Sequence, residues 1–218
     1  MPRRPPSPSP SPSRLPPRPT TNRAKPVSVA VTGGIGAGKS EALNAFARHG
    51  AAVVSSDKIV HHLIRVDPEV KRAMVERLGE EILGAQGEID RGRVAERVFG
   101  DREALAWLES LLHPRVSAEY LRWRDQLAEL PNPPRVTVTE VPLLYEVGGE
   151  TRFDKVVVIT APEQLRETRA NVSLKGRSDR LIPDREKVER ADFSYVNTGS
   201  LQELDAFIAG VMNRLTSL

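Results

Sequence analysis

A glycine-rich segment, Gly33-Gly34-Ile35-Gly36-Ala37-Gly38-Lys39-Ser40, has the spacing G-x-x-x-x-G-K-[ST] of a phosphate-binding loop. It follows an apolar strand-like run, VSVAVT, and precedes a helical pattern. Glycines let successive backbone N–H groups turn toward phosphate oxygens at a helix N-terminus. Lys39 would place a cation on the β- and γ-phosphates, and the Ser40 hydroxyl would ligate Mg²⁺. The segment predicts a nucleoside triphosphate site formed by Gly34, Ile35, Gly36, Ala37, Gly38, Lys39, Ser40 and Glu41.

A carboxylate follows the next apolar run of the chain. The run AAVVSS leads to Asp57, and ligands of an open parallel sheet gather at the carboxyl ends of its strands. Asp57 would there be placed to orient and deprotonate an acceptor hydroxyl beside the γ-phosphate. Asp is equally suited to cap the helix that follows, so this structural alternative stays open. Beside a phosphate-binding loop, catalysis is the preferred interpretation.

Strand-like apolar runs alternate with helical periodicity from Val27 onward, which is typical of an α/β fold with a parallel sheet and helices on both faces. Strands are expected at 27–32, 51–55, 135–141, 155–160 and 193–196. Helices are expected at 39–49, 57–64, 68–78, 91–98, 102–130, 162–171, 183–190 and 201–215. The stretch 68–130 shows helical patterns and no strand, so it predicts a helical insertion between the second and third strands, suited to binding a substrate.

The charge of the chain is unevenly distributed. Its 218 residues have a formal net charge of +3, which invites a nucleic-acid function. Residues 1–26 hold six basic residues and no acidic one, so the remainder, with 26 basic and 29 acidic side chains, has a net charge of −3. The sequence therefore gives no support to a nucleic-acid partner. No apolar run approaches the ~18 residues of a membrane span, and the absence of cysteine excludes thiolate chemistry and fits a cytoplasmic protein.

Residues 1–26 are expected to form a disordered tail on a domain of residues 27–218. Alternating Ser and Pro offer no hydrophobic period to bury, and they favour polyproline II conformation. A Pro-rich protein ligand, a tether to an anionic surface and an organelle transit peptide are alternatives, although prolines oppose the amphipathic helix of a transit peptide. A dispensable extension is the preferred interpretation.

Motifs along residues 27–215 resemble those of the dephospho-CoA kinases, which make the last transfer in coenzyme A synthesis. The loop TGGIGAGKS and the segment VVSSDKIV carry the first part of the resemblance. The helical stretch adds GEEIL, GEIDR, VF, LE and LHP, and VPLLYE follows the third expected strand. EKVERAD and VNTGS lie near the end. Each piece is short, but so many in one order make the match specific.

The resemblance implies a P-loop kinase fold with a five-stranded parallel sheet, a helical substrate-binding insert at about 58–130 and a short lid at about 169–182. The γ-phosphoryl group of ATP, held with Mg²⁺, would pass to the ribose 3′-hydroxyl of the small-molecule substrate dephospho-CoA. Asp57 would act on that hydroxyl, while Lys39 and the lid residues Arg169 and Arg177 would neutralise phosphoryl charge. The resemblance places the adenine-side asparagine on Asn197 and substrate contacts on Asp57, His61, His113 and Glu146.

Further expectations concern single residues of this chain. Glu140 ends the third strand and would hold a metal-bound water. His113-Pro114 is expected to fix a turn between helices and to touch the substrate rather than transfer a proton. His61 stands where the family usually has arginine, so a fixed cation becomes a titratable group. The oligomeric state stays open.

The sequence departs from the family at two sensitive places. Glu41 stands where the family usually has Thr, and its carboxylate would repel phosphate unless it points to solvent. The lid is shortened, because Arg169 and Arg177 lie closer together in the sequence than in the family. The segment still contains the cations Lys175, Arg177 and Arg180. The alternative is that these residues form a solvated surface loop. Two alternative functions therefore stay open. The protein could be a degenerate paralogue that binds nucleotide or coenzyme A with weak or no transfer, or a kinase for another small hydroxyl acceptor.

Overall fold

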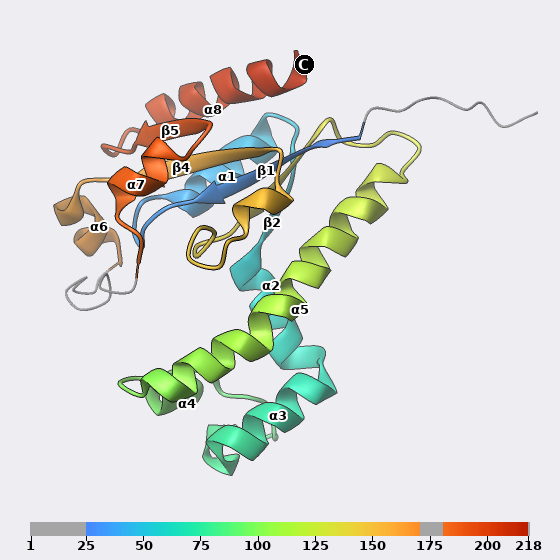
Figure 1. The fold of residues 1–218 in the computed structure, drawn as a ribbon, viewed down its shortest axis with the longest axis vertical. Coiled ribbons are helices and arrows are strands. Elements are labelled where there is room, and N and C mark those ends of the chain that lie inside the picture. Colours follow the sequence, from blue (N-terminus) through green and yellow to red (C-terminus); the bar gives the residue numbers. More distant parts are fainter. Residues whose placement is uncertain (1–24, 171–180, 218) are drawn as a thin grey trace, which may run out of the picture.

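The centre of the molecule is a parallel sheet, seen in a computed structural model that describes residues 25–170 and 181–217. Its strand order is β2-β3-β1-β4-β5 (Figure 1). The strands are β1 (Val27–Thr32), β2 (Ala52–Ser55), β3 (Val136–Glu140), β4 (Lys155–Thr160) and β5 (Phe193–Val196). Each lies within one residue of its predicted range, which confirms the α/β fold. β1, which leads into the glycine loop, is the central strand.

The two faces of the sheet are covered by different segments. Val29 and Val31 of β1 point to one face and pack with α1 (Lys39–Arg48) and α8 (Leu201–Thr216) in one apolar core. Ala30, between them, points to the other face and packs with Leu144 and Tyr145 of the segment after β3. This alternation is the period of two expected for a strand. Figure 1 shows α8 lying along the sheet on the side away from the helices that follow β2.

Helices fill the chain between β2 and β3. They are α2 (Ser56–Val66), α3 (Pro68–Leu78), α4 (Arg91–Val98) and α5 (Arg102–Ala128), with a short 3₁₀ helix η1 (Glu80–Ile82). Asp67, Asp90 and Asp101 stand at the N-caps of α3, α4 and α5, and their carboxylates accept hydrogen bonds from first-turn N–H groups. The helices share an apolar core that includes Val70 and Met74. Figure 1 shows this helical insert projecting from the sheet.

The expected turn at His113-Pro114 is wrong, because α5 runs through both residues without a break. Pro114 has no N–H group to donate to the carbonyl of Ser110, so one helical bond is missing. The apolar residues Leu112, Val116 and Tyr120 on both sides are buried, and this packing holds the helix together across the proline. Figure 1 shows α5 changing direction near its middle, which is the usual consequence of an internal proline.

The remaining short helices lie near the end of the chain. They are η2 (Glu150–Arg152), α6 (Glu163–Ala170) and α7 (Asp184–Glu189). The expected disorder of the tail concerns residues that, except for 25 and 26, lie outside the described part of the chain. The lid cations Lys175, Arg177 and Arg180 lie outside it as well, and the division into tail, insert and lid stays a prediction. In the described part, no helix is long and apolar enough to cross a membrane.

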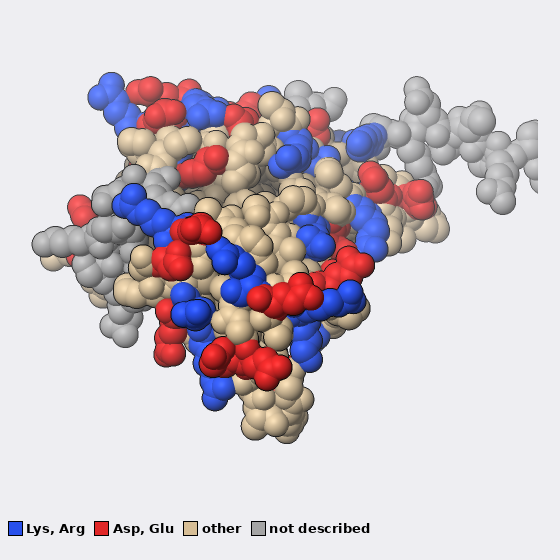
Figure 2. All heavy atoms as spheres, turned by 60° about the horizontal axis from the view of Figure 1, so that its bottom comes forward, with Lys and Arg blue, Asp and Glu red and all other residues tan. Residues whose placement is uncertain are grey.

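Charges of both signs are mixed on the surface of the insert. Figure 2 brings the helices after β2 toward the viewer. On this face, Lys and Arg side chains are interleaved with Asp and Glu. Several are paired, among them Arg77 with Glu103 at 2.7 Å and Arg122 with Glu119 at 2.5 Å. An extended surface of one sign, as nucleic-acid binding needs, is not seen on this face.

Candidate active site

The glycine loop between β1 and α1 is pressed against neighbouring backbone. Gly33, Gly36 and Gly38 have φ values of 146°, 73° and 98°, in the region that favours glycine. A Cβ atom on Gly33 would lie 1.9 Å from the carbonyl oxygen of Ile159, and one on Gly36 would lie 2.4 Å from that of Arg166. These positions therefore require glycine. The bare backbone that results, at the N-terminus of α1, is what a phosphate cradle needs.

Lys39, the first residue of α1, is folded back over this loop. Its Nζ donates a hydrogen bond to the carbonyl oxygen of Gly34 at 3.0 Å. Burial lowers the pKa of the Lys39 ammonium below its ordinary value, and the nearby carboxylates of Glu140 and Asp57 oppose this shift. A cation held by a single backbone oxygen of the glycine loop is placed to exchange that oxygen for a phosphate.

The two carboxylates mark the carboxyl ends of neighbouring strands. Glu140 ends β3 and is buried, and it lies opposite Ser55 of β2 in the ladder. Asp57 is exposed in the first turn of α2, directly after β2. Ser55 occupies the N-cap of α2, and the described residues contain no side-chain hydrogen bond that caps this helix. Asp57 is therefore not the capping residue, and the structural alternative for it does not hold.

Arg169 and Asn197 lie against the outer side of the glycine loop. The Nη1 of Arg169 donates to the carbonyl of Gly36 at 3.4 Å, and its Nη2 lies 3.5 Å from the Oδ1 of Asn197. Asn197 is buried and donates from Nδ2 to the carbonyl of Ala37 at 2.9 Å. The structure thus brings two expected site residues to the loop, whereas the expected partner Arg177 lies outside the described residues.

Arg166 is a cation at this loop that the sequence analysis missed. Its Nε donates to the carbonyl of Ile35 at 3.1 Å, and its Nη1 pairs with the Oδ2 of Asp184 at 2.8 Å. A Cβ atom on Gly34 would lie 2.8 Å from the guanidinium carbon. The side chain therefore ties α7 to the glycine loop.

Lys187 was missed as well. It is only 1% exposed, and its Nζ pairs with the Oε1 of Glu146 at 2.7 Å. That oxygen also accepts a hydrogen bond from the N–H of Ile182 at 3.2 Å. The positive charges of Lys187 and Arg166 both act to lower the pKa of Lys39. No local signal marks Lys187, because EKVERAD has the mixed charges of an exposed helix.

Two departures from the family have structural answers. The Oε1 of Glu41 pairs with the Nη1 of Arg48 at 3.1 Å, so its carboxylate lies along α1 rather than over the glycine loop. The Glu41 carboxylate therefore points away from the phosphate site, as the second of the two expectations for it required. At His61, where the resemblance would usually place arginine, the Nδ1 lies 3.2 Å from the Nη1 of Arg91, so a guanidinium stands beside this position.

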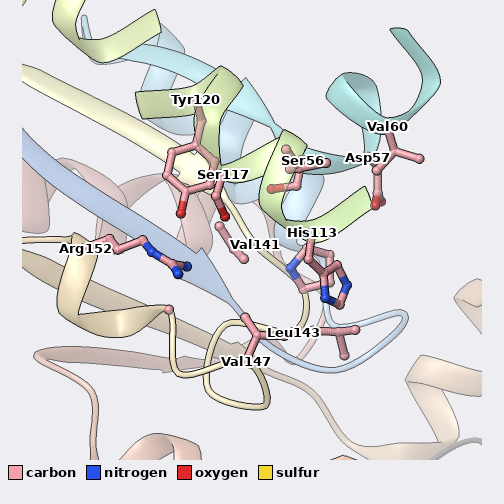
Figure 3. Close-up of a pocket in the computed structure, with 13 residues that line it drawn as sticks. Ser56, Asp57, Val60, His113, Ser117, Tyr120, Val141, Leu143, Val147 and Arg152 are labelled. Atoms are coloured by element: carbon pink, nitrogen blue, oxygen red, sulfur yellow. The ribbon is translucent and has the colours of Figure 1, made fainter. Parts of the chain in front are cut away.

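Asp57 also lines a cavity of about 140 Å³ between α2, α5 and the segment after β3. Val116, Val141, Leu143 and Val147 form apolar walls of this cavity. In Figure 3, Asp57 and His113 lie toward one end of it and Arg152 extends toward it from the other. Ser117 and Tyr120 project from α5, with their hydroxyl groups toward the same space (Figure 3). The cavity suits a small, largely apolar group with a few polar atoms.

The expected site residues therefore divide into groups. The carboxylates of Glu140 and Asp57 are near enough to Lys39 to favour its charged form, and His113 shares the cavity with Asp57. His61 lies one turn beyond Asp57 on α2. Glu146 is committed to a buried ion pair, so its contact with a substrate stays a prediction. Ser40 is exposed at the start of α1.

Comparison with known proteins identifies the family. The family model for dephospho-CoA kinase matches residues 27–203. The chain belongs to the dephospho-CoA kinase family. The dephospho-CoA kinase of Protochlamydia amoebophila is 36% identical over 187 residues, which cover 81% of this chain and 90% of that protein. That of Aquifex aeolicus is 32% identical over 194 residues, covering 86% and 97%.

Solved structures agree with the family assignment. The dephospho-CoA kinase from Campylobacter jejuni has a TM-score of 0.62 and 28% identity, covering 88% of this chain and 98% of that one. TT1252 from Thermus thermophilus has a TM-score of 0.67 and 29% identity, covering 88% and 99%. Membership confirms the resemblance based on the motifs and makes the chain a P-loop kinase of coenzyme A synthesis.

Proposed function

We propose that this protein transfers the γ-phosphoryl group of ATP to the ribose 3′-hydroxyl of dephospho-CoA, giving coenzyme A and ADP. The observation that carries the proposal is the position of Asp57. Its carboxylate acts on the charge of Lys39 at the glycine loop and also lines the neighbouring cavity. A group that faces both a phosphate cradle and an acceptor cavity stands where the two substrates of a kinase must meet.

Asp57 is the general base of the proposed reaction. It accepts the proton of the 3′-hydroxyl as the oxygen forms a bond to the γ-phosphorus and the bond from phosphorus to the β,γ-bridging oxygen breaks. Exposure of Asp57 lets the carboxylate reach a bound acceptor without a change in α2. His113, in the same cavity, contacts the acceptor.

The cations of the glycine loop neutralise charge on the transferred group. Lys39 exchanges its bond to the carbonyl of Gly34 for phosphate oxygens, and Arg169 lies next to the loop at Gly36. Arg177, in the lid, is proposed as a further cation. Asn197 lies on the adenine side, where its amide already fixes the carbonyl of Ala37.

Magnesium fits the residues at the start of α1. Among the described residues, no group of three or more His, Asp or Glu side chains could hold a metal ion alone. The exposed hydroxyl of Ser40, with Glu140 acting through water, would therefore hold Mg²⁺ together with phosphate oxygens. The ion would supply charge neutralisation at the β- and γ-phosphates.

The test compares the purified full chain with its Asp57→Asn variant in ATP-dependent phosphorylation of dephospho-CoA. Removal of a general base is expected to lower kcat by about 10²- to 10⁴-fold while ATP binding, measured by calorimetry, is retained. Asp205→Asn, an exposed carboxylate paired with Arg48 and His49, is the matched control and should keep normal turnover. Tight ATP binding without turnover by the unmodified protein would contradict the proposal and favour a degenerate paralogue.

A further inference from the structure

The short helix α7 is tied to the glycine loop at its first residue. There the carboxylate of Asp184 pairs with the guanidinium of Arg166, which belongs to α6, at 2.8 Å. The same guanidinium donates to the carbonyl of Ile35 in the glycine loop at 3.1 Å. Figure 1 shows α6 and α7 side by side. Two polar contacts in series therefore join this end of α7 to the backbone of the phosphate cradle.

The other end of α7 holds the segment after β3. Lys187, which is almost fully buried, pairs with Glu146 at 2.7 Å. Arg190, the C-cap residue of α7, pairs with Glu150, and its guanidinium carbon lies 4.3 Å from the centre of the Tyr145 ring. One turn of helix thus holds two carboxylates and one aromatic ring of this segment.

The segment that α7 holds also forms a wall of the cavity beside Asp57. Val147, which follows Glu146, and Gly149, which precedes Glu150, both line that cavity. The N–H of Gly149 donates to the carbonyl of Leu144 at 2.8 Å, which closes the segment into a compact series of turns. A displacement of α7 would therefore displace this wall.

The contacts of α7 are more polar than its anchoring requires. Val188 already packs in the apolar core with Leu144. Burying the charges of Lys187 and Glu146 costs desolvation energy that a hydrophobic pair of similar volume avoids. Ion pairs and hydrogen bonds are directional, however, whereas apolar packing is not. The polar contacts therefore suit a helix whose exact position matters more than its burial.

We propose that α7 is a brace that holds the glycine loop and the cavity wall at a fixed distance, with Asp184, Lys187 and Arg190 as positioning residues. This inference rests on the proposed function, and it adds residues that act through other residues rather than on a substrate. In-line transfer needs the reacting atoms about 3–3.5 Å apart, and a misplacement of about 1 Å can cost about 100-fold in rate. Because ATP and the acceptor bind to parts of the chain that α7 joins, its contacts determine that distance.

The first test releases one end of the brace at a time, in Asp184→Asn and Arg190→Ala. Each variant is expected to lower kcat by about 10-fold and to leave the KM values for ATP and dephospho-CoA within about twofold, because both sites stay intact and only their separation is released. Arg190→Lys keeps the charge and should retain more of kcat than Arg190→Ala.

The matched control is Arg185→Ala. Arg185 is the neighbour of Asp184 on α7, but its side chain is 90% exposed and pairs with Glu189 of the same helix at 2.9 Å. This variant should keep the kcat of the unmodified protein. An equal loss in Arg185→Ala would overturn the inference, and so would a raised KM for one substrate with unchanged kcat, since that result indicates a direct contact.

The double variant Asp184→Asn/Arg190→Ala tests whether the two ends act together. A brace needs both ends, so the double variant should lose about the same 10-fold in kcat as either single variant. Two independent effects would multiply to about 100-fold and would overturn the inference.

Hydrogen exchange tests the brace without turnover. Asp184→Asn is expected to speed exchange at the amides of Val147 and Gly149 by about 10-fold, whereas Arg185→Ala should leave it unchanged. The amides of β1 report global unfolding and should not change. Unchanged exchange at the cavity wall, or equal acceleration in β1, would overturn the inference. Absence of turnover by the unmodified protein contradicts the proposed function alone, and the exchange experiment then still decides whether α7 is a brace.

Discussion

The glycine loop and the helical insert hold their cations in different ways. At the loop, Lys39 bonds to the carbonyl of Gly34, Arg166 pairs with Asp184 and Lys187 pairs with Glu146. In the insert, Arg65, Lys71 and Arg91 face a cavity without a carboxylate partner among the described residues. The loop side is therefore fixed by internal contacts before any ligand binds, whereas these three cations of the insert are not held by a carboxylate.

The difference has a physical reason. Phosphoryl transfer depends on holding the transferred group in line, and loop contacts that exist in advance reduce the reorganisation that this requires. Discrimination between acceptors depends instead on groups that lose a partner when the wrong ligand binds. If these contacts fix the loop side firmly, breaking them should cost more stability than breaking comparable exposed contacts.

The largest effect is expected from breaking the buried pair of Lys187 and Glu146. Lys187→Met leaves the carboxylate of Glu146 buried without its partner, so the free energy of unfolding should fall by about 3 kcal/mol. The matched control is Lys155→Met, which breaks an exposed pair with Asp192 and should cost about 1 kcal/mol or less. Denaturant unfolding measures both variants. Equal losses would show that the buried pair does not fix this side of the molecule.

A double variant separates the charge from the packing. Lys187→Met combined with Glu146→Leu removes both buried charges, so most of the stability lost in the single variant should return. A double variant that is as unstable as Lys187→Met would show that the loss comes from packing around α7 instead.

A somewhat smaller effect is expected from adding a methyl group at Gly33. Gly33→Ala would place a Cβ atom 1.9 Å from the carbonyl of Ile159 in a left-handed conformation, with an expected loss of about 2–3 kcal/mol. Gly50 also has a positive φ, of 88°. Apart from the residues next to it in the chain, no atom of the described residues lies within 4 Å of a Cβ added there. Gly50→Ala should therefore show only the backbone strain, about 1 kcal/mol. Thermal unfolding measures both variants. Equal losses of stability would contradict the close packing of Gly33 against the carbonyl of Ile159.

The smallest effect concerns pH. The pKa of Lys39 is lowered in the free protein, and phosphates of bound ATP would raise it again. Nucleotide binding should therefore take up a proton at alkaline pH, and the affinity for ATP should fall as the pH rises through the pKa of the free protein. Calorimetry in two buffers of different ionisation enthalpy measures the uptake. The Lys39→Arg variant should show none in this range, and uptake that is equal in the variant would assign the proton to another group.

Most elements could be predicted from the sequence because their signals are local. The strands alternate between apolar positions on two faces, and Asp67, Asp90 and Asp101 start helices of the insert at the expected places. The glycine loop could be predicted because its spacing and its flanking elements agree. The turn expected at Pro114 was wrong because apolar residues of α5 are buried before and after the proline. Their packing outweighs one missing hydrogen bond, and a local sequence pattern does not reveal it.

The parts of the site that could not be predicted depend on contacts between distant segments. Arg166 and Lys187 lie in helices with mixed charges, and only the fold brings them to the glycine loop. The cavity lined by Arg65, Lys71 and Arg91 likewise needs α2, α3 and α4 to meet, although each helix alone looks like a solvated surface. The role of Asp57 is an intermediate case. The sequence placed Asp57 at the end of a strand but left open whether it caps the next helix. The fold answers that question, because Ser55 occupies the N-cap of α2.

The most direct test of the account is the structure of the product. The full chain, given ATP, Mg²⁺ and dephospho-CoA, should form one ADP for each molecule of coenzyme A, with the new phosphate on the ribose 3′-oxygen in a phosphorus NMR spectrum. A phosphate on another oxygen, or release of ADP with no phosphate on dephospho-CoA, would contradict the placement of the 3′-hydroxyl at Asp57.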